Sequence, residues 1–96
     1  MVELRKQDEY YTIFDMEMDG FTLSATFLNA HKSTAGHQHL WEEAYYIANG
    51  FGMVIIGREI KDAAEGDFIK IPPNTFHQVF NLGAFPMRFV CVWREK

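Results

Sequence analysis

The chain is short of several residues and patterns, and each shortage excludes a class of protein. Its 96 residues include one cysteine, Cys91, so no disulfide forms within the chain and a reducing compartment is expected. No stretch approaches the roughly 18 consecutive apolar residues of a membrane span. Basic residues number nine against thirteen acids and do not cluster, so the net charge of −4 gives a nucleic-acid groove no electrostatic support.

The N-terminus lacks the apolar segment of a signal peptide, because residues 1–9 are mostly charged or polar. We therefore expect a cytoplasmic protein with no membrane partner. A length of 96 residues suits a single domain over residues 1–96, and a content of 48% apolar residues is enough to fill its core.

Helical periodicity is missing too. Short apolar runs are interrupted throughout by Gly, Asn, Asp and Pro, which predicts an all-β fold, either a closed barrel or a double-sheet jelly roll of about eight strands or a few more. Asp19-Gly20 and Asn49-Gly50 are both expected to form two-residue hairpin turns, the second of type I′. Residues 61–66 are expected to form a loop. The expected strands are 10–18, 21–28, 43–48, 51–58, 67–71, 76–80 and 87–93, with a further strand at 37–39 after a loop at 31–36.

Four side chains of metal-binding type are present: His37, His39, Glu43 and His77. On an extended strand side chains alternate with a period of two, so His37 and His39 would share one face. Glu43 follows His39 by an even step and keeps that face if the strand continues. Any one of these residues arises by chance on a strand, but their combined spacing predicts one metal site.

This spacing resembles the two sequence signatures of the cupin superfamily. The first runs glycine, five residues, H-x-H, three or four residues, E, six residues, G, and the chain has His37-x-His39-x3-Glu43-x6-Gly50. The second runs glycine, five residues, P-x-G, two residues, H, three residues, N, and the chain has Gly66-x5-Pro72-x-Asn74-x2-His77-x3-Asn81. Together the signatures cover residues 31–81, about half of the chain.

Two positions depart from the signatures, and neither is a metal ligand. Asn74 replaces a glycine, and asparagine is the non-glycine residue that best tolerates the left-handed backbone of such a turn. His31 replaces the leading glycine of the first signature, which leaves the shape of the entry loop open. We expect His31 to be a solvated loop residue outside the site.

The resemblance implies a single-domain cupin-type jelly-roll β-barrel that binds one divalent transition metal through His37, His39, Glu43 and His77. A donor set of three imidazoles and one carboxylate suits Fe, Mn, Ni, Cu or Zn and does not choose among them. Four protein ligands on an octahedral ion leave two positions open for water, oxygen or a chelating substrate. We expect dioxygenase-like or isomerase-like action on a small polar metabolite. The alternative is a non-enzymatic cupin that binds or senses a small ligand.

Strand parity adds two residues that could support the pocket. Tyr45 shares the face of Glu43, and Asn81 shares that of His77, if no bulge intervenes. The Tyr45 hydroxyl would either bind a ligand or simply fill the barrel. Cys91 lies in an apolar run, where burial raises a thiol pKa, so it is expected in the core and not as a nucleophile. Each histidine ligand should donate its other ring N–H to an acceptor that the sequence does not identify.

The edge strands of so short a barrel need covering, so we expect a homodimer. The first strand or the Phe-rich outer face would supply its interface. A small molecule is the expected ligand, and no nucleic-acid partner is expected.

Overall fold

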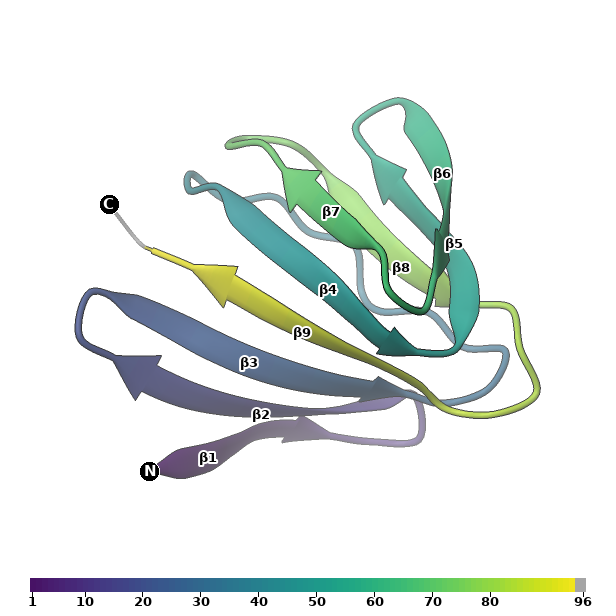
Figure 1. Cartoon of the computed structure of the whole chain (residues 1–96), viewed down its shortest axis with the longest axis horizontal. Helices are drawn as coiled ribbons and strands as arrows, with labels where there is room; N and C mark the ends of the chain where they lie inside the picture. Colours follow the sequence, from purple (N-terminus) through teal and green to yellow (C-terminus); the bar gives the residue numbers. More distant parts are fainter. Residues whose placement is uncertain (95–96) are drawn as a thin grey trace.

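Nine strands in two sheets form the fold of the computed structural model, which describes residues 1–94. The strands are β1 (Val2–Gln7), β2 (Tyr11–Met18), β3 (Phe21–Leu28), β4 (Glu43–Asn49), β5 (Phe51–Ile56), β6 (Glu59–Ala64), β7 (Phe68–Ile71), β8 (His77–Asn81) and β9 (Met87–Trp93). Six of them form a sheet of order β1-β2-β3-β9-β4-β7, and the other three form a sheet of order β6-β5-β8. Figure 1 shows β5, β6 and β8 gathered beyond the β7 edge of the larger sheet. Among the described residues, no helix has the length and apolar character needed to cross a membrane.

The all-β prediction is confirmed, and strand parity decides what faces the interior. On β4 and β8 every second side chain is buried, and the intervening positions are more exposed. The buried positions are Glu43, Tyr45 and Ile47 on β4 and His77, Val79 and Asn81 on β8. The two strands therefore place polar groups and apolar core side chains in the same interior.

One of the two expected hairpins is confirmed. Asp19-Gly20 joins β2 to β3, with Met18 opposite Phe21 and φ at Gly20 of 92°. The Asn49-Gly50 hairpin is wrong, because β4 and β5 belong to different sheets. Both edges of β4 are already paired, with β7 and β9, so no edge remains for β5.

Gly50 serves a different purpose from the one predicted. Its φ is 96°, while Asn49 does not take the positive φ that a type I′ turn requires. A Cβ at Gly50 would lie 3.0 Å from the Cα of Met87, so the glycine is needed where the chain crosses between the sheets close to β9.

Two other sequence predictions are corrected. The loop expected at 61–66 is wrong up to Ala64, because β6 runs from Glu59 to Ala64 and pairs with β5. Its residues are polar because most of β6 is exposed, not because the segment is irregular. The real turn is Gly57-Arg58, which shortens the expected strand 51–58 and joins Ile56 to Glu59. The strand β1 was not predicted, since its side chains are almost all exposed and give no apolar pattern.

The segment with His37 and His39 is not the regular strand that was expected. It lies antiparallel beside β8 and is joined to it by isolated bridges, Ser33 to Phe80 and His37 to His77. The backbone N–H groups of His37 and His77 each donate to the other's carbonyl, at 3.2 and 2.9 Å. The segment thus fixes its histidines against β8 without belonging to a longer strand.

Both departures from the cupin signatures adopt the backbone of the glycine they replace. Asn74 has φ of 56°, which confirms the prediction for the proline turn. His31 has φ of 62°, so this exposed histidine also takes the left-handed conformation, and the leading-glycine position keeps a glycine-type backbone.

Candidate metal centre

The four predicted ligands meet at one place although they come from three parts of the chain. Glu43 begins β4, His77 begins β8, and His37 and His39 lie on the segment bridged to β8. One ligand atom from each of the four lies within 4.8 Å of all the others. Glu43 and His77 are buried, His39 is partly buried and His37 is exposed. The cluster is therefore closed on the barrel side and open to solvent beside His37.

The facing atoms are the Nε2 nitrogens and one carboxylate oxygen. His39 Nε2 is 3.0 Å from Glu43 Oε1, and His77 Nε2 is 3.3 Å from the same oxygen. His37 Nε2 is 2.7 Å from His77 Nε2. These separations suit donor atoms that converge on a shared cation.

The opposite ring nitrogens of two histidines are held by backbone carbonyls. His39 Nδ1 donates to the carbonyl of Trp41 at 2.9 Å, and His77 Nδ1 donates to the carbonyl of Thr75 at 2.9 Å. A carbonyl only accepts, so the neutral rings carry their proton on Nδ1 and present an Nε2 lone pair to the cluster. No side-chain pattern reveals such acceptors, because a backbone carbonyl of any residue can supply them.

A positive charge at the centre of the cluster would satisfy these groups. The Nδ1–H groups of His39 and His77 already donate to backbone carbonyls, so a second proton or a cation beside each Nε2 would offset the Glu43 carboxylate. Burial and the neighbouring His77 charge lower the pKa of His37, so several protons are poorly accommodated together. Burial alone would raise the pKa of Glu43, but its contacts with His77 and His39 outweigh burial and lower it. One metal ion would satisfy all four ligands.

The donor set fits a divalent transition metal. Imidazole nitrogen and carboxylate oxygen are ligands for Fe, Mn, Ni, Cu and Zn, and the backbone contacts at Nδ1 orient two of the rings as metal sites require. His37, His39, Glu43 and His77 would hold the ion.

A cavity of about 50 Å³ extends from this cluster into the barrel. It is lined by Arg5, Tyr11, Ile13, Ser24, Thr26, Thr34, Ala35, His37, Glu43, Tyr45, His77, Phe89 and Cys91. Tyr45 thus lies where parity predicted, with its ring 6.1 Å from that of His77 and stacked on Phe89. Burial raises the pKa of Tyr45 well above its ordinary value, so its hydroxyl stays protonated and able to donate.

Asn81 is buried as parity requires, but the structure does not bring it to the cavity. Its Nδ2 lies 3.0 Å from Leu28 O, 3.2 Å from Asn29 O and 2.9 Å from Phe85 O, and its Oδ1 accepts from the N–H of Gly83 at 2.8 Å. The side chain therefore ties the end of β3 to the connection between β8 and β9.

Replacing Asn81 by alanine should lower the free energy of unfolding by about 3 kcal/mol, because three carbonyls and one N–H lose their partner. Urea denaturation of the metal-free protein measures this change. Asn29→Ala removes a single exposed contact to the Glu9 carbonyl and should cost less than about 1 kcal/mol. Metal content should be unaffected by either substitution. A loss of metal in Asn81→Ala would mean that Asn81 supports the metal centre after all.

Cys91 lies in the core, as predicted. It is 4% exposed, and burial, followed by the Glu43 carboxylate, raises the pKa of its thiol well above the ordinary value. A thiol in this state is a poor nucleophile at neutral pH.

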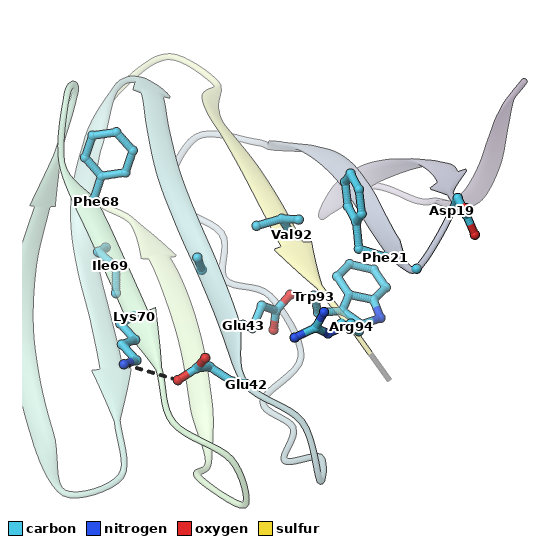
Figure 2. Close-up of a pocket in the computed structure, with 12 residues that line it drawn as sticks. Asp19, Phe21, Glu42, Glu43, Phe68, Ile69, Lys70, Val92, Trp93 and Arg94 are labelled. Atoms are coloured by element: carbon cyan, nitrogen blue, oxygen red, sulfur yellow. Dashed lines mark ion pairs between the residues drawn. The ribbon is translucent and has the colours of Figure 1, made fainter. Parts of the chain in front are cut away.

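A larger hollow of about 700 Å³ lies on the outer face of the six-stranded sheet. Figure 2 shows Phe68 at one end of it and Phe21 and Trp93 at the other, with the Glu42–Lys70 ion pair between them. Glu43 also lines this hollow, but none of the three histidines of the cluster does. The small interior cavity is therefore the better candidate site, although it is by far the smaller of the two.

A jelly roll whose interior carries three histidines and one glutamate at one end defines a class of protein, the cupins. The family model described as "Cupin domain" matches residues 26–93, and the chain belongs to that family. Both sequence signatures, at residues 31–81, lie inside the matched region.

The chain is similar to proteins of several organisms. An uncharacterised protein of Methanocaldococcus jannaschii is 34% identical over 71 residues, which are 73% of this chain and 57% of that protein. The chain thus spans somewhat more than half the length of this relative. A solved cupin 2 conserved barrel domain protein from Rhodopseudomonas palustris has a TM-score of 0.84 and 23% identity, over 100% of this chain and 72% of its own. A variant of oxalate decarboxylase from Bacillus subtilis has a TM-score of 0.85 and 15% identity, over 93% of this chain and 27% of its own. At these identities the solved structures show a shared fold alone.

Proposed function

We propose that this cupin binds one divalent transition metal through His37, His39, Glu43 and His77 and acts on a small polar metabolite at the open coordination positions. Dioxygenase-like and isomerase-like reactions both suit such a centre. The observation that carries the proposal is the convergence of three imidazole nitrogens and one carboxylate oxygen within 4.8 Å at the end of a cavity.

The exposure of the cluster to solvent on one side supports a catalytic role for the metal over a purely structural one. His77 and Glu43 side chains are 1% and 7% exposed, whereas His37 lies on the solvent side of the cluster. A metal held there would be buried on one side and reachable on the other, which is the arrangement that a substrate needs. Structural metal sites are instead closed by protein ligands on all sides.

The bound metal would supply Lewis acidity or oxygen activation, according to the element. The chain's own residues would orient the reactants and exclude water. Tyr45 offers a protonated hydroxyl beside the centre, and Phe89 and Ile13 supply apolar cavity wall. The Trp41 and Thr75 carbonyls would hold His39 and His77 in one orientation throughout.

Non-enzymatic binding of a small ligand is the second candidate. The small interior space of about 50 Å³ favours it, because a snug pocket retains a ligand and leaves little room for reactants to exchange. The cytoplasmic location, the homodimer, the single-domain organisation and the absence of a nucleic-acid partner stay predictions from the sequence.

Elemental analysis of untagged protein purified without chelators tests the proposal. We expect close to one iron, manganese, nickel, copper or zinc per chain, lost in the His37→Ala/His77→Ala double variant because two of four ligands are gone. The control is His31→Ala, which removes an exposed histidine outside the cluster and should keep the metal. Wild-type protein that stays empty after all five metals are added would contradict the proposal. The element found decides whether oxygen consumption or isomerisation is assayed next.

A further inference from the structure

The edge strand β1 contains an irregularity at Arg5. Leu4 pairs with Phe14 and Lys6 pairs with Ile13, so Arg5 is an extra residue without a partner on β2. Such a β-bulge changes the direction of side chains relative to the regular alternation. Here the bulge directs Arg5 to the same side as Asp15, whose carboxylate Oδ2 lies 2.8 Å from Arg5 Nε.

This direction brings a cation to the candidate metal centre. Arg5 lines the interior cavity together with the ligands His37, Glu43 and His77. It is the one arginine or lysine among the residues that line this cavity in the described part of the chain. A guanidinium at the mouth of the cavity is notable in a chain with a net charge of −4.

The guanidinium retains capacity to bind a ligand. Within residues 1–94, Asp15 is the one acid that forms an ion pair with Arg5, and the pair uses Nε. The terminal nitrogens form no other ion pair there, and the Arg5 side chain is 47% exposed. Asp15 Oδ1 is buried without a hydrogen-bond partner, so the contact is not the two-point fork that would occupy the guanidinium fully.

We propose that Arg5 is the anion-recognition residue of the site, and that the ligand is a small carboxylate held between the metal centre and the Arg5 guanidinium. This inference rests on the proposed metal-binding function. A planar carboxylate matches the fork of a guanidinium. A space of about 50 Å³ admits only a few non-hydrogen atoms, and this small size also favours a carboxylate over a bulkier anion. A longer ligand would have to extend outside the cavity beside Arg5 and His37.

A purely structural role for Arg5 makes a different prediction. Its contacts with Asp15 and with the Trp93 ring, 5.6 Å away, would then serve only to hold β1 on the sheet. Substitution would lower the melting temperature without distinguishing charged from neutral ligands.

Zinc-loaded protein is titrated with glycolate and with its neutral analogue glycolamide, and binding is followed by amide chemical shifts in NMR. Arg5→Met should weaken glycolate binding by about tenfold or more, since a charge-assisted pair is lost, and leave glycolamide within about twofold. Arg58→Met, an exposed arginine in the β5–β6 turn, is the matched control and should change neither affinity.

Zinc content is measured first in every variant. If zinc is bound but glycolate binds Arg5→Met and wild type equally, the anion-recognition role is overturned and the metal function survives. An equal loss for glycolate and glycolamide also overturns it, because Arg5 would then act on the structure alone. Wild type that takes up no zinc or any other divalent metal overturns the metal function, and the Arg5 proposal with it.

Discussion

Exchanging Glu43 for glutamine is expected to weaken the affinity for divalent metal by about a hundredfold or more. Glutamine keeps the size of the side chain but removes the negative charge and presents a weaker oxygen ligand. Loss of residues that merely orient metal ligands already costs about 10- to 100-fold in affinity, and a direct ligand should cost at least as much. Competition with a fluorescent chelator measures the affinity.

The neighbouring glutamate gives a matched control. Glu42 has a side chain that is 57% exposed and pairs with Lys70 at 3.2 Å on the outer face, so Glu42→Gln should leave the affinity within about twofold. Equal effects of the two substitutions would mean that Glu43 acts only through the general charge of the chain and is not a ligand.

The Glu43→Gln substitution should weaken metal binding without lowering the stability of the metal-free protein. In wild type, Glu43 Oε1 faces two Nε2 atoms at 3.0 and 3.3 Å, and burial of the carboxylate is offset only if those rings take up protons. The amide of glutamine can instead donate to an Nε2 lone pair. A site selected for metal binding and not for stability should lose metal affinity in this variant while the metal-free protein stays as stable as wild type. Chemical denaturation in the presence of a chelator measures that stability.

Gly52→Ala is the second substitution with a large expected effect, and it acts on the fold. Gly52 lies on β5 opposite Asn81, and a Cβ built there would collide with the backbone carbonyl oxygen of Phe80. The obstacle is backbone, so β5 and β8 must separate. We expect the free energy of unfolding to fall by about 3 kcal/mol or more, which is a large part of the roughly 5 to 15 kcal/mol that stabilises a domain.

Guanidinium denaturation of the metal-free protein tests this expectation. Gly83→Ala is the control, because its Cβ would meet the Phe51 ring at 3.3 Å, and a side chain can move where backbone cannot. That change should stay below about 1 kcal/mol. A Gly52→Ala variant as stable as wild type would mean that the β5–β8 pairing adjusts readily. Because β8 begins with His77, the same variant should also bind metal less tightly.

Turn chemistry was a reliable guide only where strand neighbours agreed with it. Asp19-Gly20 forms its hairpin because β2 and β3 are free to pair with each other. Asn49-Gly50 is the stronger local signal, yet its strands separate because β9 and β7 occupy both edges of β4. Those partners are distant in the sequence, so no local pattern reports them.

The four predicted ligands do lie together, although part of the reasoning that grouped them was wrong. Parity along one strand was expected to align His37, His39 and Glu43, but the chain bends at Leu40 and Trp41 and β4 begins only at Glu43. The ligands converge because the bridge to β8 fixes His37 opposite His77. The resemblance to the cupin signatures supplied the ligands independently of the strand geometry.

The sequence by itself determined the all-β class, the inward faces of β4 and β8, the identity of the four candidate metal ligands and the burial of Cys91. The candidate ligands follow from the spacing of the cupin signatures, and the rest follow from residue type and from alternation along the chain, which are local properties. Only the tertiary structure decided the crossing at Gly50, the engagement of Asn81 by backbone, the carbonyls that orient His39 and His77, and the entry of Arg5 into the cavity. Each of these depends on contacts between segments far apart in the sequence, and a contact of that kind is fixed by which strands pair and in what register, not by the residues of either segment alone.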